Sequence, residues 1–380
     1  MEFLFWCSVL LTVYIYIGYP FVVGVLARRQ AVVEHQSNSF PKVSILIAAY
    51  NEEECIVNTL NNKLSLDYPN DNYEIIVVSD ECTDSTDALV QQISESSDVP
   101  IRLVRQIPRR GKTSGLNLIV PEATGEIIVF SDANSIWEKD VLEKLTSNFQ
   151  EASVGYVTGK MVYVNQDGTL IGDGCSSYMK YENWLRSGES ALGSIVGVDG
   201  GIDAMRKSLY ESLRADQLPD FVQPLKVVEK GYRVVYDDRA SLKEDSLDSM
   251  DDEYRMRVRV SLRAMWALLD MRQLLNPLKF RFFSWQLFSH KVLRYLAFIP
   301  ISLAFLANAM LVAEGFYTTL FICQLFFYLL VLKGHRSSDK NLPNYIALPY
   351  YFIILNVACA HAFVRFIKGE KQVIWTPRVG

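Results

Sequence analysis

The sequence predicts an α/β domain with a mostly parallel sheet, flanked by apolar segments long enough to span a membrane. Two observations support this prediction. In the polar middle of the chain, strand-like apolar runs alternate with helix-like segments about four times, the pattern of a parallel sheet covered by helices on both faces. Toward both ends, long apolar runs with few or no charges replace this alternation.

The first apolar segment runs from Phe3 to Leu26 without a charged residue, and Arg28 and Arg29 follow it directly. Its length suits a membrane-spanning helix, and it lacks the basic leader and small-residue cleavage site of a signal peptide. We therefore predict that residues 1–27 form an uncleaved anchor. The basic flank predicts that residue 28 onward lies in the cytosol.

The predicted sheet begins with a strand at Val43–Ala48, which Pro41 introduces. The polar run Asn51–Glu54 follows it and is expected to open a helix. A second strand, Glu74–Val78, repeats this design and has Asp80 at its end.

The next elements continue the alternation. Thr83–Asp87 supplies the N-cap and first-turn acids of a second helix. A third strand is expected at Ile101–Arg105, a third helix from Lys112, and a fourth strand over Glu126–Ser131. Every one of these strands ends in a polar residue, and ligands of such sheets bind at the rim that these strand ends form.

The fourth strand contains four consecutive apolar residues, Ile127–Phe130, and Asp132 and Asn134 follow shortly after them. Their alternate spacing allows both side chains to turn oxygens toward one hard divalent cation, Mg²⁺ or Mn²⁺, which would in turn hold the phosphates of a nucleotide. The alternative is an ordinary turn, where Asp and Asn are common. The chain has no GxGxxG and no Walker lysine loop, which disfavours dinucleotide oxidoreductases and P-loop enzymes.

Three further apolar segments lie toward the carboxyl end: Leu296–Val312, Phe316–Leu332 and Tyr345–Val364. Each is near the length that a span needs, and we predict spans here, although buried core helices are the alternative. Three spans after a cytosolic domain would leave the tail outside, whereas its basic residues favour the inside. Either one segment is re-entrant or interfacial, or the charge rule fails.

These observations predict five regions. They are an anchor (1–27), a cytosolic catalytic domain (40–250), amphipathic interfacial helices (251–294), membrane helices (295–366) and a tail (367–380). The formal net charge of −5 argues against a general nucleic-acid binder, and we expect no nucleic-acid partner. The six cysteines form no CxxC pair, so we predict neither a zinc site nor a disulfide framework.

Four short motifs follow one another along the chain: Ala49–Glu52, Ser79–Thr86, Arg110–Asn117 and Asp132–Asn134. They resemble, in turn, the first-strand nucleotide motif, the "DGSTD" segment, the "GKxxALN" segment and the "DxD" of the inverting family-two glycosyltransferases. The chain resembles the membrane-embedded, cellulose-synthase-like branch of this family, which has the GT-A fold. The resemblance covers roughly residues 43–260.

The resemblance implies a multi-pass enzyme of the plasma or inner membrane with a cytosolic catalytic domain. It would move a sugar from a nucleotide sugar, a UDP-sugar by resemblance, to a saccharide or lipid-linked acceptor in cell-surface polysaccharide synthesis. The metal ligands would be Asp132 and Asn134, although Asn134 replaces the family's second acid. The nucleotide-binding residues implied are Ala49, Tyr50, Asn51, Glu52, Asp80, Lys112, Asp132 and Arg259.

The resemblance also indicates a catalytic base and an acceptor loop. Leu218–Phe221 looks like the family's acidic motif, and Asp220 is our candidate base, with Asp216 as the runner-up. A helix N-cap is the alternative role for Asp220. Gly200, Gly201 and Arg206 fall where the family places its acceptor loop; an ordinary turn is the alternative there.

Within the helix expected at Glu253–Ala267, Arg255, Arg259 and Arg263 share one face. Arg259 aligns with the arginine of the family's "QxxRW" motif and is predicted to clamp the donor diphosphate. The alternative is that all three arginines rest on anionic lipid headgroups.

The tryptophan of that motif is replaced by Val260. In the family's processive polymerases it helps to bind the acceptor, so this departure favours a single-sugar transferase, whereas the membrane segments favour a polysaccharide synthase. A non-catalytic membrane scaffold with a decayed transferase domain is the remaining alternative.

Overall fold

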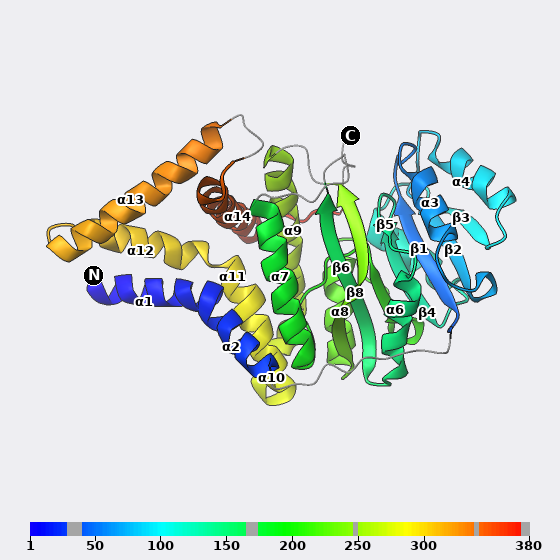
Figure 1. The fold of residues 1–380 in the computed structure, drawn as a ribbon, viewed down its shortest axis with the longest axis horizontal. Coiled ribbons are helices and arrows are strands. Elements are labelled where there is room, and N and C mark those ends of the chain that lie inside the picture. Colours follow the sequence, from blue (N-terminus) through cyan, green and yellow to red (C-terminus); the bar gives the residue numbers. More distant parts are fainter. Residues whose placement is uncertain (29–39, 165–173, 246–249, 338–341, 374–380) are drawn as a thin grey trace. The chain divides into compact units, whose positions relative to one another are not determined.

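The computed structural model describes residues 1–28, 40–164, 174–245, 250–337 and 342–373, and Figure 1 shows its elements. The chain divides into two compact units. We call one the helical unit; it comprises Met1–Arg29, Thr169–Gly188 and Ser246–Glu370. The other, the sheet unit, comprises Gln30–Gly168, Glu189–Asp245 and Lys371–Gly380.

The sheet unit is built on one eight-stranded sheet, in the order β3-β2-β1-β4-β7-β6-β8-β5. Strand β1 pairs in parallel with β2 and β4, β2 with β3, and β6 with β8, whereas β7 lies antiparallel between β4 and β6. The bounds are β1 (Val43–Ala49), β2 (Tyr73–Ser79), β3 (Ile101–Arg105), β4 (Ile127–Asp132), β5 (Ile136–Trp137), β6 (Val154–Val164), β7 (Asp203–Arg206) and β8 (Arg233–Asp245).

The four strands predicted from the sequence are therefore present and parallel. Strands β1 and β2 are buried along their whole length, as expected for apolar strands that are covered on both faces. Helix α5 packs on β1 and β2, and α4 packs on β3. The helices of this unit are α3 (Ile56–Leu64), α4 (Thr86–Glu95), α5 (Lys112–Ile119), α6 (Val141–Ser147) and α8 (Pro219–Glu229).

The helix starts follow the predicted capping signals with one exception. Helix α4 begins at Thr86, whose backbone N–H donates to Asp84 Oδ1 at 3.0 Å. Helix α3 begins at Ile56, five residues later than the polar run suggested. The reason is Asn51, whose φ of 53° is incompatible with a right-handed helix and whose Oδ1 accepts from Thr83 N–H at 2.9 Å.

The helical unit contains the apolar segments. Its elements are α1 (Glu2–Val13), η1 (Tyr14–Gly18), α2 (Tyr19–Ala27), most of α7 (Gly174–Ala191), α9 (Met250–Asp270), η5 (Arg272–Leu275), α10 (Pro277–Leu287), η6 (Phe288–Val292), α11 (Leu293–Tyr295), α12 (Phe298–Met310), α13 (Gly315–Arg336) and α14 (Asn344–Ile367). Helix α9 packs against α14, and α13 also packs against α14. Small side chains permit the first of these contacts: Ala358 and Ala362 of α14 are fully buried beside Leu262 of α9.

Three helical stretches in the described residues are long and apolar enough to cross a membrane: Glu2–Ala27, Gly315–Arg336 and Asn344–Ile367. The separate span predicted at Leu296–Val312 requires a correction. Helix α12 has only 13 residues, about 20 Å of helix, which is shorter than a bilayer core. It pairs instead with Pro277–Tyr295 across a 57° bend, as one broken span or a re-entrant loop.

Candidate active site

Three predicted residues from distant parts of the sequence meet beyond the carboxyl end of β4. Lys112 is the first residue of α5, Asp132 the last of β4, and Asp220 lies in the first turn of α8. The ammonium of Lys112 donates to Asp132 Oδ1 at 2.8 Å and lies 3.5 Å from Asp220 Oδ1. This is the rim where parallel sheets bind ligands.

The predicted acceptor loop approaches the same carboxylates. Gly200 and Gly201 have φ angles of +81° and +73°, which side chains rarely adopt. A Cβ at Gly200 would lie 3.2 Å from the Asp220 carboxylate, and one at Gly201 would lie 3.3 Å from Asp132 Oδ2. Both glycines therefore serve close backbone approach, which an ordinary turn would not require.

The charges of this cluster are strongly coupled. Burial would lower the pKa of Lys112, but Asp132 and Asp220 together raise it above its ordinary value. Lys112 therefore remains a cation and partly neutralises two carboxylates.

Asp203 is a further acid beside this cluster that the sequence analysis did not identify. It lies on β7 opposite Phe130 of β4 and Thr158 of β6, and it is fully buried. Burial, and then the charge of Asp220, raise the pKa of Asp203 to about 8. In the sequence, Asp203 stands out only as one carboxylate among the small and apolar residues 200–205. Ordinary surface turns show the same pattern, so it does not indicate a buried acid.

The carboxylate of Asp80 holds the loop that precedes α5. It accepts from Gln106 Nε2 at 2.5 Å, from Arg110 N–H at 2.9 Å and from Gly111 N–H at 3.0 Å, and it is 2% exposed. These bonds fix the start of α5 and with it Lys112. The predicted contact of Asp80 with a nucleotide base stays a prediction.

The other predicted nucleotide residues lie next to Asp80. The carbonyl of Ala49 accepts from Asp80 N–H at 2.9 Å, and Glu52 N–H donates to Thr86 Oγ1 at 2.8 Å. The guanidinium carbon of Arg109 lies 3.3 Å from the centre of the Tyr50 ring. The loops after β1 and β2 are thus joined into one surface.

The predicted metal ligands lie in a tight turn at the end of β4. Asn134 is half-buried, and Ser135 N–H donates to the carbonyl of Asp132 at 3.3 Å. Across the described ranges, no group of three or more His, Cys, Asp or Glu side chains could hold a metal ion. A single carboxylate and an amide oxygen nevertheless suit Mg²⁺, which often binds through one or two carboxylates together with substrate phosphates.

Lys63 lies next to this turn, and the sequence analysis did not predict a role for it. Its ammonium donates to the carbonyl of Ser135 at 2.6 Å and lies 3.9 Å from the centre of the Trp137 ring. Lys63 is fully buried, and burial lowers its pKa well below the ordinary value. A lysine on a short amphipathic helix gives no sequence signal that would separate it from a surface residue.

Arg206 does not lie with the other predicted site residues. In the β4–β7 ladder it pairs with Ile127, at the start of β4, whereas Asp203 pairs with Phe130 near its end. The Arg206 guanidinium donates to the backbone carbonyls of Val154 and Phe149, at 2.8 and 2.7 Å. It therefore braces the chain ahead of β6, and we exclude it from the acceptor loop.

Two further predicted residues are placed as follows. Asp216, the runner-up base, pairs with Arg214 at 3.1 Å and with Lys371, and not with the Lys112 cluster. Arg259 lies on α9, in the helical unit, so its contact with the donor diphosphate stays a prediction.

Residues 44–213 match the family described as Glycosyl transferase family 2. A beta-monoglucosyldiacylglycerol synthase from Nostoc sp. is 30% identical over 190 residues, which cover 50% of this chain and 40% of that protein. A poly-beta-1,6-N-acetyl-D-glucosamine synthase from Staphylococcus epidermidis is 24% identical, and the alignment covers 97% of this chain and 95% of that protein. The chain thus spans well under half the length of the first relative.

Among solved structures, mannosyltransferase PcManGT from Pyrobaculum calidifontis, in complex with GDP-Man and Mn²⁺, superimposes with a TM-score of 0.75. The two chains are 21% identical, and the match covers 97% of this chain and 99% of that one. At this identity the likeness concerns the fold, and it confirms the predicted fold class.

Proposed function

We propose that this chain is a membrane-bound inverting glycosyltransferase, because residues 44–213 match the family described as Glycosyl transferase family 2. It would transfer a sugar from a nucleotide sugar, a UDP-sugar by the resemblance, to a saccharide or lipid-linked acceptor. The observation that carries this proposal is the convergence of Lys112, Asp132 and Asp220 at one rim of the sheet.

In the proposed mechanism, Asp220 is the base that accepts the proton of the acceptor hydroxyl as the sugar is transferred. The backbone of Gly200 approaches this carboxylate closely, so the predicted acceptor loop lies beside the proposed base. Lys112 orients Asp220 and lends positive charge to the place where the diphosphate leaves.

Asp132 and Asn134 are the residues proposed to hold Mg²⁺ or Mn²⁺. A divalent cation bound there would supply charge neutralisation for the departing diphosphate. The solved mannosyltransferase is in complex with GDP-Man and Mn²⁺, which supports extending a nucleotide sugar and a divalent cation to this chain. Arg259 is proposed as a further diphosphate contact, on the resemblance alone.

The class of acceptor is inferred from the relatives of this chain. One is named for a glucosyldiacylglycerol and another for a polysaccharide, so a lipid-linked or saccharide acceptor is proposed, in cell-surface polysaccharide or glycolipid synthesis. Lys112, Asp132 and Asp220 remain together, which argues against a decayed scaffold.

Membrane topology can be argued from one ion pair. Lys371, four residues after the end of α14, pairs with Asp216 of the sheet unit. This pair supports a tail on the same side of the membrane as the catalytic domain. The chain would then cross the membrane an even number of times between the catalytic domain and the tail. Helices α13 and α14 would each cross it, and the bent pair Pro277–Tyr295 and Phe298–Met310 would enter and leave by the same face of the membrane. We propose this arrangement, with the catalytic side cytosolic as the basic flank of the anchor predicts.

A donor panel tests the proposed function. Membranes containing the chain are incubated with radiolabelled nucleotide sugars, and product is separated into lipid-extractable and polymeric fractions. Transfer of one sugar by the wild type, lost in Asp220→Asn, is the expected result. The proposed activity fails if no donor supports transfer by the wild type, whereas equal transfer by the Asp220→Asn membranes would remove Asp220 as the base.

A further inference from the structure

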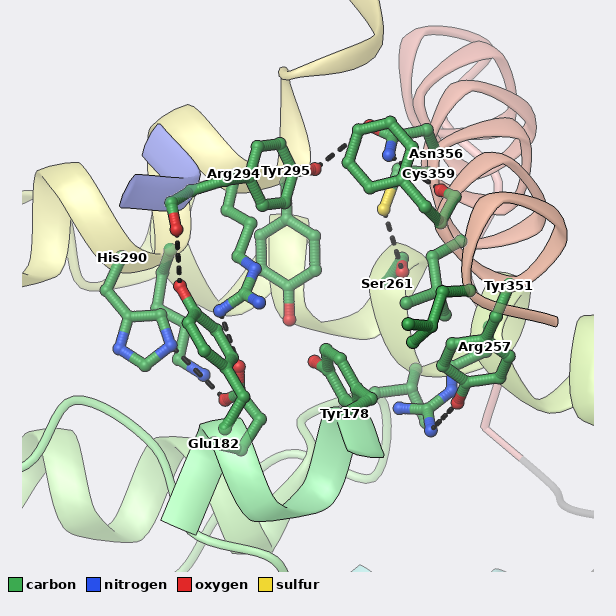
Figure 2. Close-up of a pocket in the computed structure, with 17 residues that line it drawn as sticks. Tyr178, Glu182, Arg257, Ser261, His290, Arg294, Tyr295, Tyr351, Asn356 and Cys359 are labelled. Carbon is green, nitrogen blue, oxygen red and sulfur yellow. Dashed lines mark hydrogen bonds and ion pairs between the residues drawn. The ribbon is translucent and has the colours of Figure 1, made fainter. Parts of the chain in front are cut away.

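The helical unit encloses a pocket that the proposed chemistry does not use. Its volume is about 380 Å³, within the size range of small-molecule sites. Helices α7, α9, α11 and α14 line it, together with η1 and η6, and all of its lining residues belong to this unit. Figure 2 shows its labelled side chains converging on a central space.

The lining carries charged side chains, and two of its cations, Arg294 and Arg257, pair with carboxylates. Arg294 Nη1 lies 2.5 Å from Glu182 Oε1, and Arg257 Nε lies 2.7 Å from Glu253 Oε1. Glu182 and Glu253 are both buried. Burial would raise the pKa of Glu182, but Arg294 and His290 hold it well below its usual range, so the carboxylate stays ionised.

Two tyrosine hydroxyls in this pocket have no such partner. In Figure 2 the hydroxyls of Tyr178, from α7, and Tyr295, from α11, both point into the middle of the pocket. Neither hydroxyl makes a hydrogen bond to any residue that the structure describes. By contrast, the neighbouring hydroxyls of Tyr16 and Tyr351 are engaged, with Asn356 and Glu253. Hydroxyls facing a cavity are available to a ligand that carries hydroxyls of its own.

The apolar part of the lining comes largely from a candidate membrane span. Leu348, Phe352 and Leu355 of α14 line the pocket, and Val260 of α9 adds a small side chain. Val260 stands where the resembled family has a tryptophan. The shorter side chain leaves part of the pocket open.

We propose that this pocket binds the hydroxyl-bearing head of a neutral lipid. The two free hydroxyls would hydrogen-bond the head, and the apolar residues of α14 would contact the start of the acyl chains. An anionic head is disfavoured because Arg294 and Arg257 are already paired with carboxylates. A polar site between candidate spans fits a ligand that arrives from the bilayer. The inference rests on the membrane placement in the proposed function.

Two kinds of neutral lipid carry such a hydroxyl-bearing head, a diacylglycerol and a glycosylated diacylglycerol. The test uses the purified full chain in nanodiscs and a diacylglycerol probe with a photoactivatable acyl chain. Unlabelled competitors with the same chains are diacylglycerol, monohexosyl-diacylglycerol, phosphatidic acid and triacylglycerol. Adducts are mapped by peptide mass spectrometry. We expect labelling of pocket-lining peptides, with competition by the first two lipids only, and their ranking identifies the preferred lipid.

The variants separate this pocket from general lipid contact. In Tyr178→Phe/Tyr295→Phe, loss of two hydrogen bonds should weaken probe binding roughly tenfold. Tyr328→Phe is the matched control, because Tyr328 lies on α13 outside the pocket; it should bind as the wild type does. Val260→Trp fills the pocket and should also reduce labelling, which keeps the test decisive if the double variant does not fold.

Three results would overturn the inference: phosphatidic acid or triacylglycerol competing as well as diacylglycerol, labelling outside the pocket only, or variants that label like the wild type. Labelling requires no turnover. Nucleotide-sugar binding is measured by calorimetry on the same preparations, so a chain that binds lipid here but no donor would sink the proposed function and leave the pocket assignment standing.

Discussion

The ammonium of Lys112 lies 3.5 Å from the carboxylate of Asp220, although the two residues come from helices that lie far apart in the sequence. The same ammonium contacts Asp132 at 2.8 Å. One cation thus ties the end of β4 to the start of α8, and each side chain of this trio can be tested separately.

Replacing Asp220 by asparagine should lower turnover by roughly 10²–10⁴-fold, the usual contribution of a positioned base, while donor binding stays near normal. The measurement is single-turnover transfer alongside calorimetric donor affinity. Asp216→Asn is the matched control, since Asp216 pairs with Arg214 and Lys371 away from this cluster. A normal Asp220→Asn enzyme together with an inactive Asp216→Asn enzyme would assign the base to Asp216.

Asp132→Ala should abolish transfer with little change in thermal stability, because the proposed cation loses its only carboxylate. Chelation of the wild type should give the same loss, and added Mn²⁺ or Mg²⁺ should restore the chelated enzyme but not the variant. Asn134→Asp should retain activity with an altered metal preference. Full activity in the presence of chelator would remove the metal from the mechanism.

Asp203 gives a pH dependence of definite sign. An unfolded chain loses this proton near pH 4, whereas the folded protein keeps it to about pH 8. Between these values the folded state holds the extra proton, so rising pH lowers the stability. Asp203→Asn cannot lose a proton and should melt at a higher temperature than the wild type at pH 8.5, and at a similar temperature at pH 4.5.

Asp237→Asn is the control of opposite sign. Burial would raise the pKa of Asp237, but hydrogen bonds from Arg239 and Asn148 lower it, so its charge stabilises the fold above pH 4. That variant should melt below the wild type at neutral pH. If Asp203→Asn melts below the wild type at pH 8.5, as Asp237→Asn does at neutral pH, the pKa of Asp203 is not raised in the folded protein.

The arginine face of α9 distinguishes a diphosphate clamp from lipid contact. If Arg259 clamps the diphosphate, Arg259→Lys should lose nearly as much activity as Arg259→Ala, because lysine cannot form the bidentate fork. Arg255 and Arg263 should tolerate lysine, each contributing about 1 kcal/mol of membrane attraction. Six variants, assayed for transfer and for membrane retention, decide between the roles. Equal and mild effects at all three positions would exclude the clamp.

The sequence predicted those features whose causes are local. The apolar runs of β1 to β4 and the polar residues at the start of α4 determine their own structure, and Asp132 lies at the carboxyl end of β4 as the strand pattern predicts. It could not predict Asp203 or Lys63, because their importance comes from burial by segments that are distant in sequence. Arg206 was misplaced for a related reason, since only the antiparallel register of β7 reveals which end of the sheet it occupies.

The apolar segments illustrate the same limit. Hydropathy alone separates Phe316–Leu332 and Tyr345–Val364 well, because each corresponds to one helix. It cannot detect the 57° bend before α12, because hydropathy reports composition and not the direction of the backbone.

The charges around Lys112 also have a thermodynamic consequence. One ammonium facing two carboxylates leaves the cluster with a net negative charge, which repels a diphosphate that arrives alone. Donor and divalent cation should therefore bind cooperatively, and by linkage each must tighten the other by the same factor, on the order of tenfold. Paired titrations, donor at several Mn²⁺ concentrations and Mn²⁺ at several donor concentrations, measure both factors. Lys112→Met, which deepens the negative charge, should weaken donor binding in the absence of the cation and make the coupling larger.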